Sequence, residues 1–396
     1  MIATVASHLD GPQPASEAPA GYPWRARDLR IDFLRGAVIV AMVVDHVGGD
    51  SSWLYAITGG NRFYVSAAEG FVFLAGVVAG MVYGPRAARK GGAAAARLLR
   101  RAGIIYLWTM VLTLTAPFIA RALELGWEDP LRGYTPLQFV VGVLTLHRAY
   151  HLTDVLLLYV LLFSVAGLVI VWMVDGHTKA VLIWSWATWG LWQTATDYPA
   201  PWDIQAMTVF QFAAWQALFV TGLAIGIHRD ALAARFSRRG SQLCLLVGGL
   251  GLAGAIVSYQ LRAVNRTLGA GAATHLVSKA DLGIGRLLVF ACLSLFAVGL
   301  VSLAWRWLDA GFGWLLLPLG QNSLTAYILH IGVVMAAAKL GLIAFGSQAG
   351  SGQNTLVQLT AVLVLWALIK VWARALPRLV PRPAPPPPAR LEAQLA

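Results

Sequence analysis

Charge and cysteine are both scarce in this chain. Charged residues make up only 12% of the 396 residues, whereas hydrophobic residues make up 58%. A soluble domain carries about twice that share of charge. The two cysteines, Cys244 and Cys292, lie in apolar segments without the spacing of a zinc site or a CxxC motif, so we expect buried thiols and no bound metal. The composition predicts a polytopic membrane protein.

The N-terminal region lacks the apolar core of a secretory signal. Residues 1–26 are polar and rich in Pro and Ala, which predicts a disordered cytoplasmic leader. Residues 377–396 are basic and proline-rich, which is typical of a spacer, and we expect a cytoplasmic tail there. Residues 27–376 then form a single transmembrane domain.

Apolar stretches long enough to cross a bilayer, about 20 residues each, recur along that domain. They predict an all-α transmembrane bundle of about ten spans, near 31–49, 63–83, 101–120, 153–174, 179–194, 206–227, 241–260, 286–305, 314–336 and 355–376. No internal repeat is evident, which disfavours a transporter built from inverted repeats.

The distribution of positive charge orients these spans. With the N-terminus in the cytoplasm, the inner segments hold 20 of the 30 Lys and Arg residues and the outer segments hold 9, leaving Arg35 within a span. Because cytoplasmic loops carry the excess of Lys and Arg, we expect both termini to be cytoplasmic. The net charge of +12 is then a topology signal, the bilayer is the partner it implies, and nucleic-acid binding is not expected.

Two ionisable residues mark one face of the first span. Arg35 and His46 are eleven residues apart, which is close to a whole number of helical turns, so their side chains share a face. Asp32 lies near the same stripe. Ionisable groups at membrane depth are costly and usually mark a pathway or a reaction site. We therefore expect the function along this stripe.

Polar residues on other spans are predicted to reach the same depth as His46. At about 1.5 Å per residue, six side chains share a layer near the outer face, namely His46, Glu69, Asp154, Gln211, Arg286 and His330. Arg35 instead lies about 6 Å from the inner edge. The pattern indicates an acid–base centre near the outer face and a cationic anchor near the cytoplasm.

These residue types suit acyl transfer. A buried histidine can take the proton from a hydroxyl that attacks a carbonyl, and a carboxylate such as Asp45 or Glu69 can orient it. An arginine low in the membrane suits a phosphate or a carboxylate. The donor we expect is an acyl thioester carried by a phosphorylated cofactor.

The residues around this pair also carry a family likeness. The stretch RDLRIDFLRGAVIVAMVVDH (27–46) resembles the opening of the membrane acyltransferase 3 superfamily, and the chain more specifically resembles its OpgC branch. The supporting stretches are SAAEGFVFLAGVVAGMVYG (66–84), HLTDVLLLYVLL (151–162), FQFAAWQALFVTG (210–222), SKADLGIGRLL (278–288) and LGQNSLTAYILH (319–330).

The resemblance implies a bacterial inner-membrane enzyme that moves an acyl group, succinyl first, from cytoplasmic acyl-CoA to a hydroxyl of a periplasmic glucan. It implies no permanently bound cofactor. His46 is then the general base, Glu69 its orienting carboxylate and Arg35 the donor-side anchor. Residues in matching stretches that are candidates for donor or acceptor binding are Asp32, Asp154, Trp215, Gln216, Lys279, Arg286 and His330.

Several alternatives stay open at this point. Acetyl-CoA is the nearest rival donor. A transporter or flippase for a glycan precursor or anionic solute would use the same charged stripe as a permeation path, and a membrane scaffold would leave Arg35 and His46 without a role. His46 and Glu69 can also serve as hydrogen-bond partners between helices, and Arg35 can extend to lipid headgroups. A homo-oligomer is compatible with the sequence.

Overall fold

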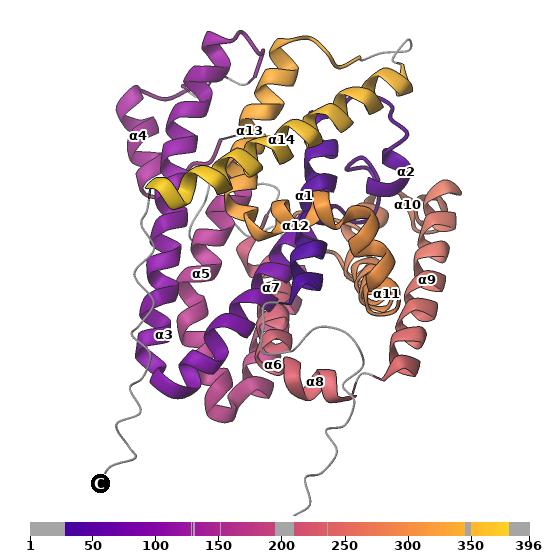
Figure 1. Cartoon of the computed structure of the whole chain (residues 1–396). Coiled ribbons are helices and arrows are strands. Elements are labelled where there is room, and N and C mark those ends of the chain that lie inside the picture. Colours follow the sequence, from indigo (N-terminus) through magenta and orange to yellow (C-terminus); the bar gives the residue numbers. More distant parts are fainter. Residues whose placement is uncertain are drawn as a thin grey trace, which may run out of the picture.

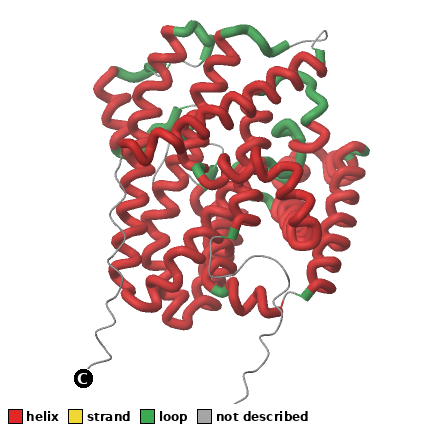
Figure 2. The backbone as a smooth tube through the Cα atoms, in the orientation of Figure 1, coloured by secondary structure: helices red, strands yellow, loops and turns green. Residues whose placement is uncertain are grey.

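The computed structural model describes residues 28–379 except 128, 130, 151, 195–209, 236 and 345–349. That part contains no β-strand, and its helices form a bundle (Figures 1 and 2). The predicted leader lies outside the described residues. Of the predicted tail, residues 377–379 belong to the last helix and the remainder lies outside the described residues.

The described residues form fourteen α-helices and two π-helical turns. Their bounds are α1 Leu29–Val47, α2 Tyr55–Thr58, α3 Ala67–Ala122, α4 Pro136–Leu144, α5 Asp154–Trp172, the π-helical turn η1 Met173–His177, α6 Thr178–Thr194, α7 Phe212–Ile227, α8 Arg229–Arg235, α9 Arg238–Gln260, α10 Ala263–Leu276, α11 Ile284–Leu308, the π-helical turn η2 Asp309–Gly313, α12 Trp314–Gln321, α13 Ser323–Lys339 and α14 Ser351–Leu379.

Helix α1 lies inside the bundle and packs against α3, α12, α13 and α14. Its start is fixed by Asp28, whose side chain accepts a hydrogen bond from the backbone N–H of Arg30 at 3.0 Å. Its end is fixed by Gly48, which takes the positive φ of +80° that most other residues avoid. Both ends of the helix that carries Arg35 and His46 are thus set by local sequence.

Helices α3 and α7 cross with their backbones in close contact. Gly76 and Gly80 on α3 meet Gly222 and Gly226 on α7, each pair being four residues apart. A Cβ placed on Gly226 would lie 2.1 Å from the carbonyl oxygen of Val77, so the two backbones are in direct contact. Such small-residue seams are the common way for helices to pack where burial from water contributes little.

Each of the ten predicted spans overlaps a helix, although the boundaries differ. Helix α3 includes Pro85 and covers most of the predicted span 63–83 and all of 101–120, whereas the predicted span 314–336 is broken at Asn322 between α12 and α13. Six helical stretches of the described chain are long and apolar enough to cross a membrane. The count of ten and the side on which the termini lie stay predictions.

Candidate functional site

A cavity of about 900 Å³ lies among α1, α3, α5, α13 and the connections that join the helices at this end of the bundle. Its walls carry His46 and Asp45 from α1, Asp154 from the start of α5, and Lys279 from the connection between α10 and α11. This volume is at the upper end of the range for small-molecule sites, about 300–1,000 Å³. We call it the outer cavity.

A second cavity of about 90 Å³ is lined by Arg35, Arg101 and Tyr159. We call it the inner cavity. Phe71 and Tyr327 line both cavities, and their rings stand edge to face with centroids 6.0 Å apart and planes at 88°. These two rings therefore form a wall that the cavities share, and α1 places Arg35 on one side of it and His46 on the other.

His46 is hydrogen-bonded through Nδ1, which lies 3.0 Å from Nε2 of His330 on α13. His330 is fully buried, and its own Nδ1 forms a short hydrogen bond with the backbone carbonyl of Tyr327. Tyr327 in turn donates its hydroxyl to the carbonyl of Leu152 at 2.6 Å. His46 lines the outer cavity, whereas His330 lies behind it.

Glu69 lies against Arg286, in a fully buried ion pair between α3 and α11. One carboxylate oxygen accepts from Nε of Arg286, and the other accepts from the backbone N–H and the hydroxyl of Ser66, each at 3.0 Å. Both oxygens of Glu69 are thus engaged at the start of α3. The structure places Glu69 with Arg286, and it places His330, which the sequence reasoning had put among the binding residues, against His46.

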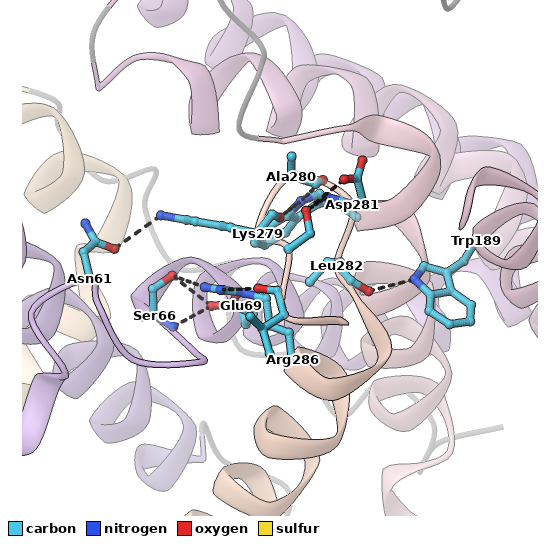
Figure 3. A network of polar contacts seen from close by, with 12 residues as sticks. Asn61, Ser66, Glu69, Trp189, Lys279, Ala280, Asp281, Leu282 and Arg286 are labelled. Atoms are coloured by element: carbon cyan, nitrogen blue, oxygen red, sulfur yellow. Dashed lines mark hydrogen bonds and ion pairs between the residues drawn. The ribbon is translucent and has the colours of Figure 1, made fainter. Parts of the chain in front are cut away.

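The connection that carries Lys279 is held in place by indole N–H groups (Figure 3). Trp215 donates to the carbonyls of Lys279 and Ala280, both at 3.1 Å, and Trp189 donates to the carbonyl of Leu282 at 3.0 Å. Trp192 donates to the carboxylate of Asp281 at 2.9 Å. Three tryptophans from α6 and α7 therefore fix the backbone of residues 279–282.

From this fixed backbone the side chain of Lys279 extends across the outer cavity. Its ammonium donates to Oδ1 of Asn61 at 3.3 Å and lies 5.5 Å from the ring centroid of Phe210. Burial lowers the pKa of Lys279 below the ordinary value for a lysine. The negative charges of Glu69, Asp154 and Asp45 oppose this change, and the positive charge of Arg286 adds to it. Lys279 is thus a cation on the cavity wall whose charge is costly to keep.

Two carboxylates face the same cavity. Asp45 accepts a hydrogen bond from the hydroxyl of Thr58 at 2.7 Å through one oxygen, while its other oxygen is buried without a hydrogen-bond partner among the described residues. Asp154, at the first turn of α5, accepts from the backbone N–H of Val155 at 2.9 Å. As adjacent residues on one helix, Asp45 and His46 point about 100° apart, yet both reach the cavity wall.

Arg35 lines the inner cavity and contacts Ser323 and Asp32. Its guanidinium forms a short hydrogen bond with the hydroxyl of Ser323 at the start of α13 and lies 3.6 Å from the carboxylate of Asp32. Arg101 shares the cavity and lies 5.3 Å from the ring centroid of Phe163. Its Nε is buried and has no hydrogen-bond partner in the described chain.

Trp215 and Gln216 are both buried outside the cavity walls. Gln216 exchanges hydrogen bonds with Ser185 on α6, its carbonyl accepting from the hydroxyl and its amide donating to the backbone, both at 2.7 Å. The structure therefore places this pair beneath the site, where Trp215 supports the connection of Lys279 and Gln216 joins α6 to α7. Gln211, just before α7, hydrogen-bonds through its backbone to Ala280.

Sequence reasoning missed several residues of the site, and some had a detectable signal. Tyr327 precedes His330 by three residues and so shares its helix face. Trp189 and Trp192 have the same spacing on α6. Phe71 has no such signal, because it is one of several aromatic residues within the predicted span 63–83. Arg101 was not missed, because the cluster of Arg97, Arg100 and Arg101 suits coenzyme A phosphates, although topology alone also explains it.

Among the described residues, no group of three or more His, Cys, Asp or Glu side chains is placed to hold a metal ion.

Comparison with known proteins identifies a family. No curated protein and no solved structure matches the chain. A family model described as OpgC protein matches residues 27–375, which includes every helix described above except the last turn of α14. The chain belongs to the OpgC family.

Proposed function

We propose that this protein is a membrane O-acyltransferase that moves an acyl group, succinyl first, from cytoplasmic acyl-CoA to a hydroxyl of a periplasmic glucan. The observation that carries the proposal is the pair of cavities along α1. His46 lines the outer one and Arg35 lines the inner one, and among the described residues Phe71 and Tyr327 are the two that line both. A reaction with its donor on one side of the bilayer and its acceptor on the other needs this arrangement.

The reaction that we assign to the outer cavity needs only the acyl thioester and the acceptor hydroxyl. His46 takes the proton of the acceptor hydroxyl as the oxygen forms a bond with the thioester carbon. The carbon–sulfur bond then breaks, and the proton passes from the imidazolium to the departing thiolate of coenzyme A. Arg35 and Arg101 are the groups we assign to the donor on the inner side, because guanidinium groups bind phosphate well.

Succinyl is favoured over acetyl by the charge at Lys279. A succinyl group ends in a free carboxylate, which needs a cation to enter a half-buried cavity. The charge of Arg286 is already balanced by Glu69, whereas Lys279 lines the cavity and donates to the neutral amide of Asn61. We therefore assign Lys279 to the donor carboxylate.

The test is acyl transfer by the purified protein in liposomes. Radiolabelled succinyl-CoA and acetyl-CoA are compared with a periplasmic glucan as acceptor, for the wild type, His46→Gln and His228→Gln. We expect labelled glucan from succinyl-CoA, a loss of about 100-fold or more in His46→Gln, and no change in His228→Gln, because His228 hydrogen-bonds to Thr178 away from both cavities.

Two results would count against the proposal. If folded wild-type protein consumes neither thioester and labels no glucan, the enzyme assignment fails and transport of a glycan precursor becomes the better explanation. If His46→Gln retains full activity, the reaction stands but the base lies elsewhere.

A further inference from the structure

The hydrogen bonds behind His46 form a chain whose proton positions can be worked out. The chain runs from the backbone carbonyl of Tyr327 to Nδ1 of His330, and from Nε2 of His330 to Nδ1 of His46. Each neutral imidazole has one N–H donor and one acceptor nitrogen. The end of the chain therefore decides which nitrogen of His46 carries the proton.

The carbonyl oxygen of Tyr327 can only accept, so Nδ1 of His330 must carry a proton. His330 is fully buried, and no carboxylate is among its hydrogen-bond partners in the described chain, so a second proton on it would leave an uncompensated buried charge. Neutral His330 then presents Nε2 as an acceptor. His46 must donate to it through Nδ1.

From this we infer that His330 is a positioning residue, which holds His46 in the tautomer protonated at Nδ1 and leaves Nε2 as the nitrogen that accepts a proton. In free histidine the opposite tautomer, protonated at Nε2, is the more populated. The inference rests on the proposed function only for its catalytic meaning. The tautomer itself is a property of the folded protein.

The arrangement does for His46 what an orienting carboxylate does in an acyl-transfer triad, with a neutral partner. When His46 takes the proton of the acceptor, its Nδ1–H becomes a donor with positive charge and its hydrogen bond to His330 strengthens. Glu69 is not needed for this task, because its two oxygens are engaged by Arg286 and Ser66. Its role is to fix the start of α3.

The test is nitrogen-15 NMR of the full chain in detergent, with only histidine labelled. The two-bond proton–nitrogen pattern separates the tautomers, and the signals of His46 and His330 are assigned by their loss in His46→Gln and His330→Gln. We expect both residues to be protonated at Nδ1 in the wild type. A wild-type spectrum with His46 protonated at Nε2 overturns the inference, whatever the activity.

Two substitutions at His330 then separate positioning from packing. His330→Gln keeps an acceptor for His46 and a donor for the carbonyl of Tyr327, so we expect the His46 tautomer to persist and kcat to stay within about tenfold. His330→Leu removes the acceptor. We expect the Nε2–H tautomer to appear at His46, kcat to fall by about 100-fold or more, and KM to change little.

The proposed acyl transfer and the positioning role of His330 can be refuted separately. If the wild type shows the expected tautomers but transfers no acyl group from either thioester, the proposed function fails and the assignment of His330 stands. If folded His330→Leu keeps both the tautomer and the turnover of the wild type, the role of His330 is packing alone and the inference fails.

Discussion

Lys279 and Arg286 lie seven residues apart and differ in what balances their charge. Arg286 pairs with Glu69 inside the protein, whereas Lys279 lines the outer cavity and hydrogen-bonds to a neutral amide. Burial lowers the pKa of Lys279, so its ammonium loses its proton at a lower pH than an ordinary lysine does. If Lys279 holds the donor carboxylate, that binding is present at low pH and is lost as the pH rises through the lowered pKa.

Lys279→Arg should extend succinyl transfer to higher pH, because a guanidinium keeps its charge throughout this range. The measurement is KM for succinyl-CoA between pH 6 and 10, in the wild type and the variant, with acetyl-CoA as the control donor. We expect KM for succinyl-CoA to rise with pH in the wild type and to rise later in Lys279→Arg. Identical pH dependence for the two proteins, or the same rise for acetyl-CoA, would remove Lys279 from the donor site.

The buried ion pair of Glu69 and Arg286 is predicted to matter for the stability of the fold. Removing one partner leaves the other charge buried without compensation, which costs about 3–5 kcal/mol. Glu69→Gln and Arg286→Met should therefore each lower the thermal midpoint strongly, whereas the double variant Glu69→Leu/Arg286→Met should recover much of the loss. Thermal unfolding in detergent measures this, and additive losses in the double variant would contradict a structural pairing.

At the scale of helices, the seam of α3 and α7 depends on four glycines. At Gly226 a side chain would meet the backbone of Val77, which cannot rotate away. Overpacking of this kind costs about 1–3 kcal/mol or more, so Gly226→Leu should lower the thermal midpoint by several degrees or prevent folding. Gly190→Leu on α6 is the matched control, because nothing lies within 4 Å of a Cβ there. Equal thermal midpoints for the two variants would show that α3 and α7 can move apart at this contact without a loss of stability.

The sequence predicts the positions of the helices well and the contacts between them poorly. The expected span 241–260 lies within α9 (238–260), and 31–49 nearly coincides with α1, because apolar length and helix caps are local signals. Periodicity also placed Arg35 and His46 on one face. Periodicity contains no information on which residues of other helices that face contacts. The contact of His46 with His330 joins residues 284 apart, and that of Glu69 with Arg286 joins residues 217 apart.

The same limit explains the tryptophans. Trp189 and Trp192 are compatible with an interfacial belt when α6 is considered alone, and only the position of residues 279–282 shows what their N–H groups bind. Trp215 was a candidate for donor or acceptor binding, and its indole N–H instead donates to two backbone carbonyls of a segment more than 60 residues away.

For the whole molecule, the wall of Phe71 and Tyr327 is the feature that organises the two cavities. The inner cavity, at about 90 Å³, is far smaller than the about 300–1,000 Å³ of small-molecule sites, so a thioester arm would have to displace side chains to reach His46. Phe71→Ala should open the wall and let water from the outer cavity reach the thioester. We expect hydrolysis of succinyl-CoA without an acceptor to rise at least about tenfold, a change of about 1.4 kcal/mol in the barrier.

Phe73→Ala is the control for this variant. Phe73 lies two residues further along α3, packs on Phe290 at 5.5 Å and lines neither cavity. The same rise in hydrolysis in both variants would attribute it to a loosened bundle, and no rise in Phe71→Ala would show that the donor does not pass this wall.

The closed wall also bears on the energy supply of a cell. A continuous file of water between two compartments conducts protons, and a cell that maintains a proton-motive force cannot tolerate such a leak. Under the proposed function, the edge-to-face rings of Phe71 and Tyr327 between the cavities would let an acyl group cross in discrete steps without a continuous water file. The arrangement would let the cell modify molecules outside its membrane with activated groups made inside, without dissipating its electrochemical gradient.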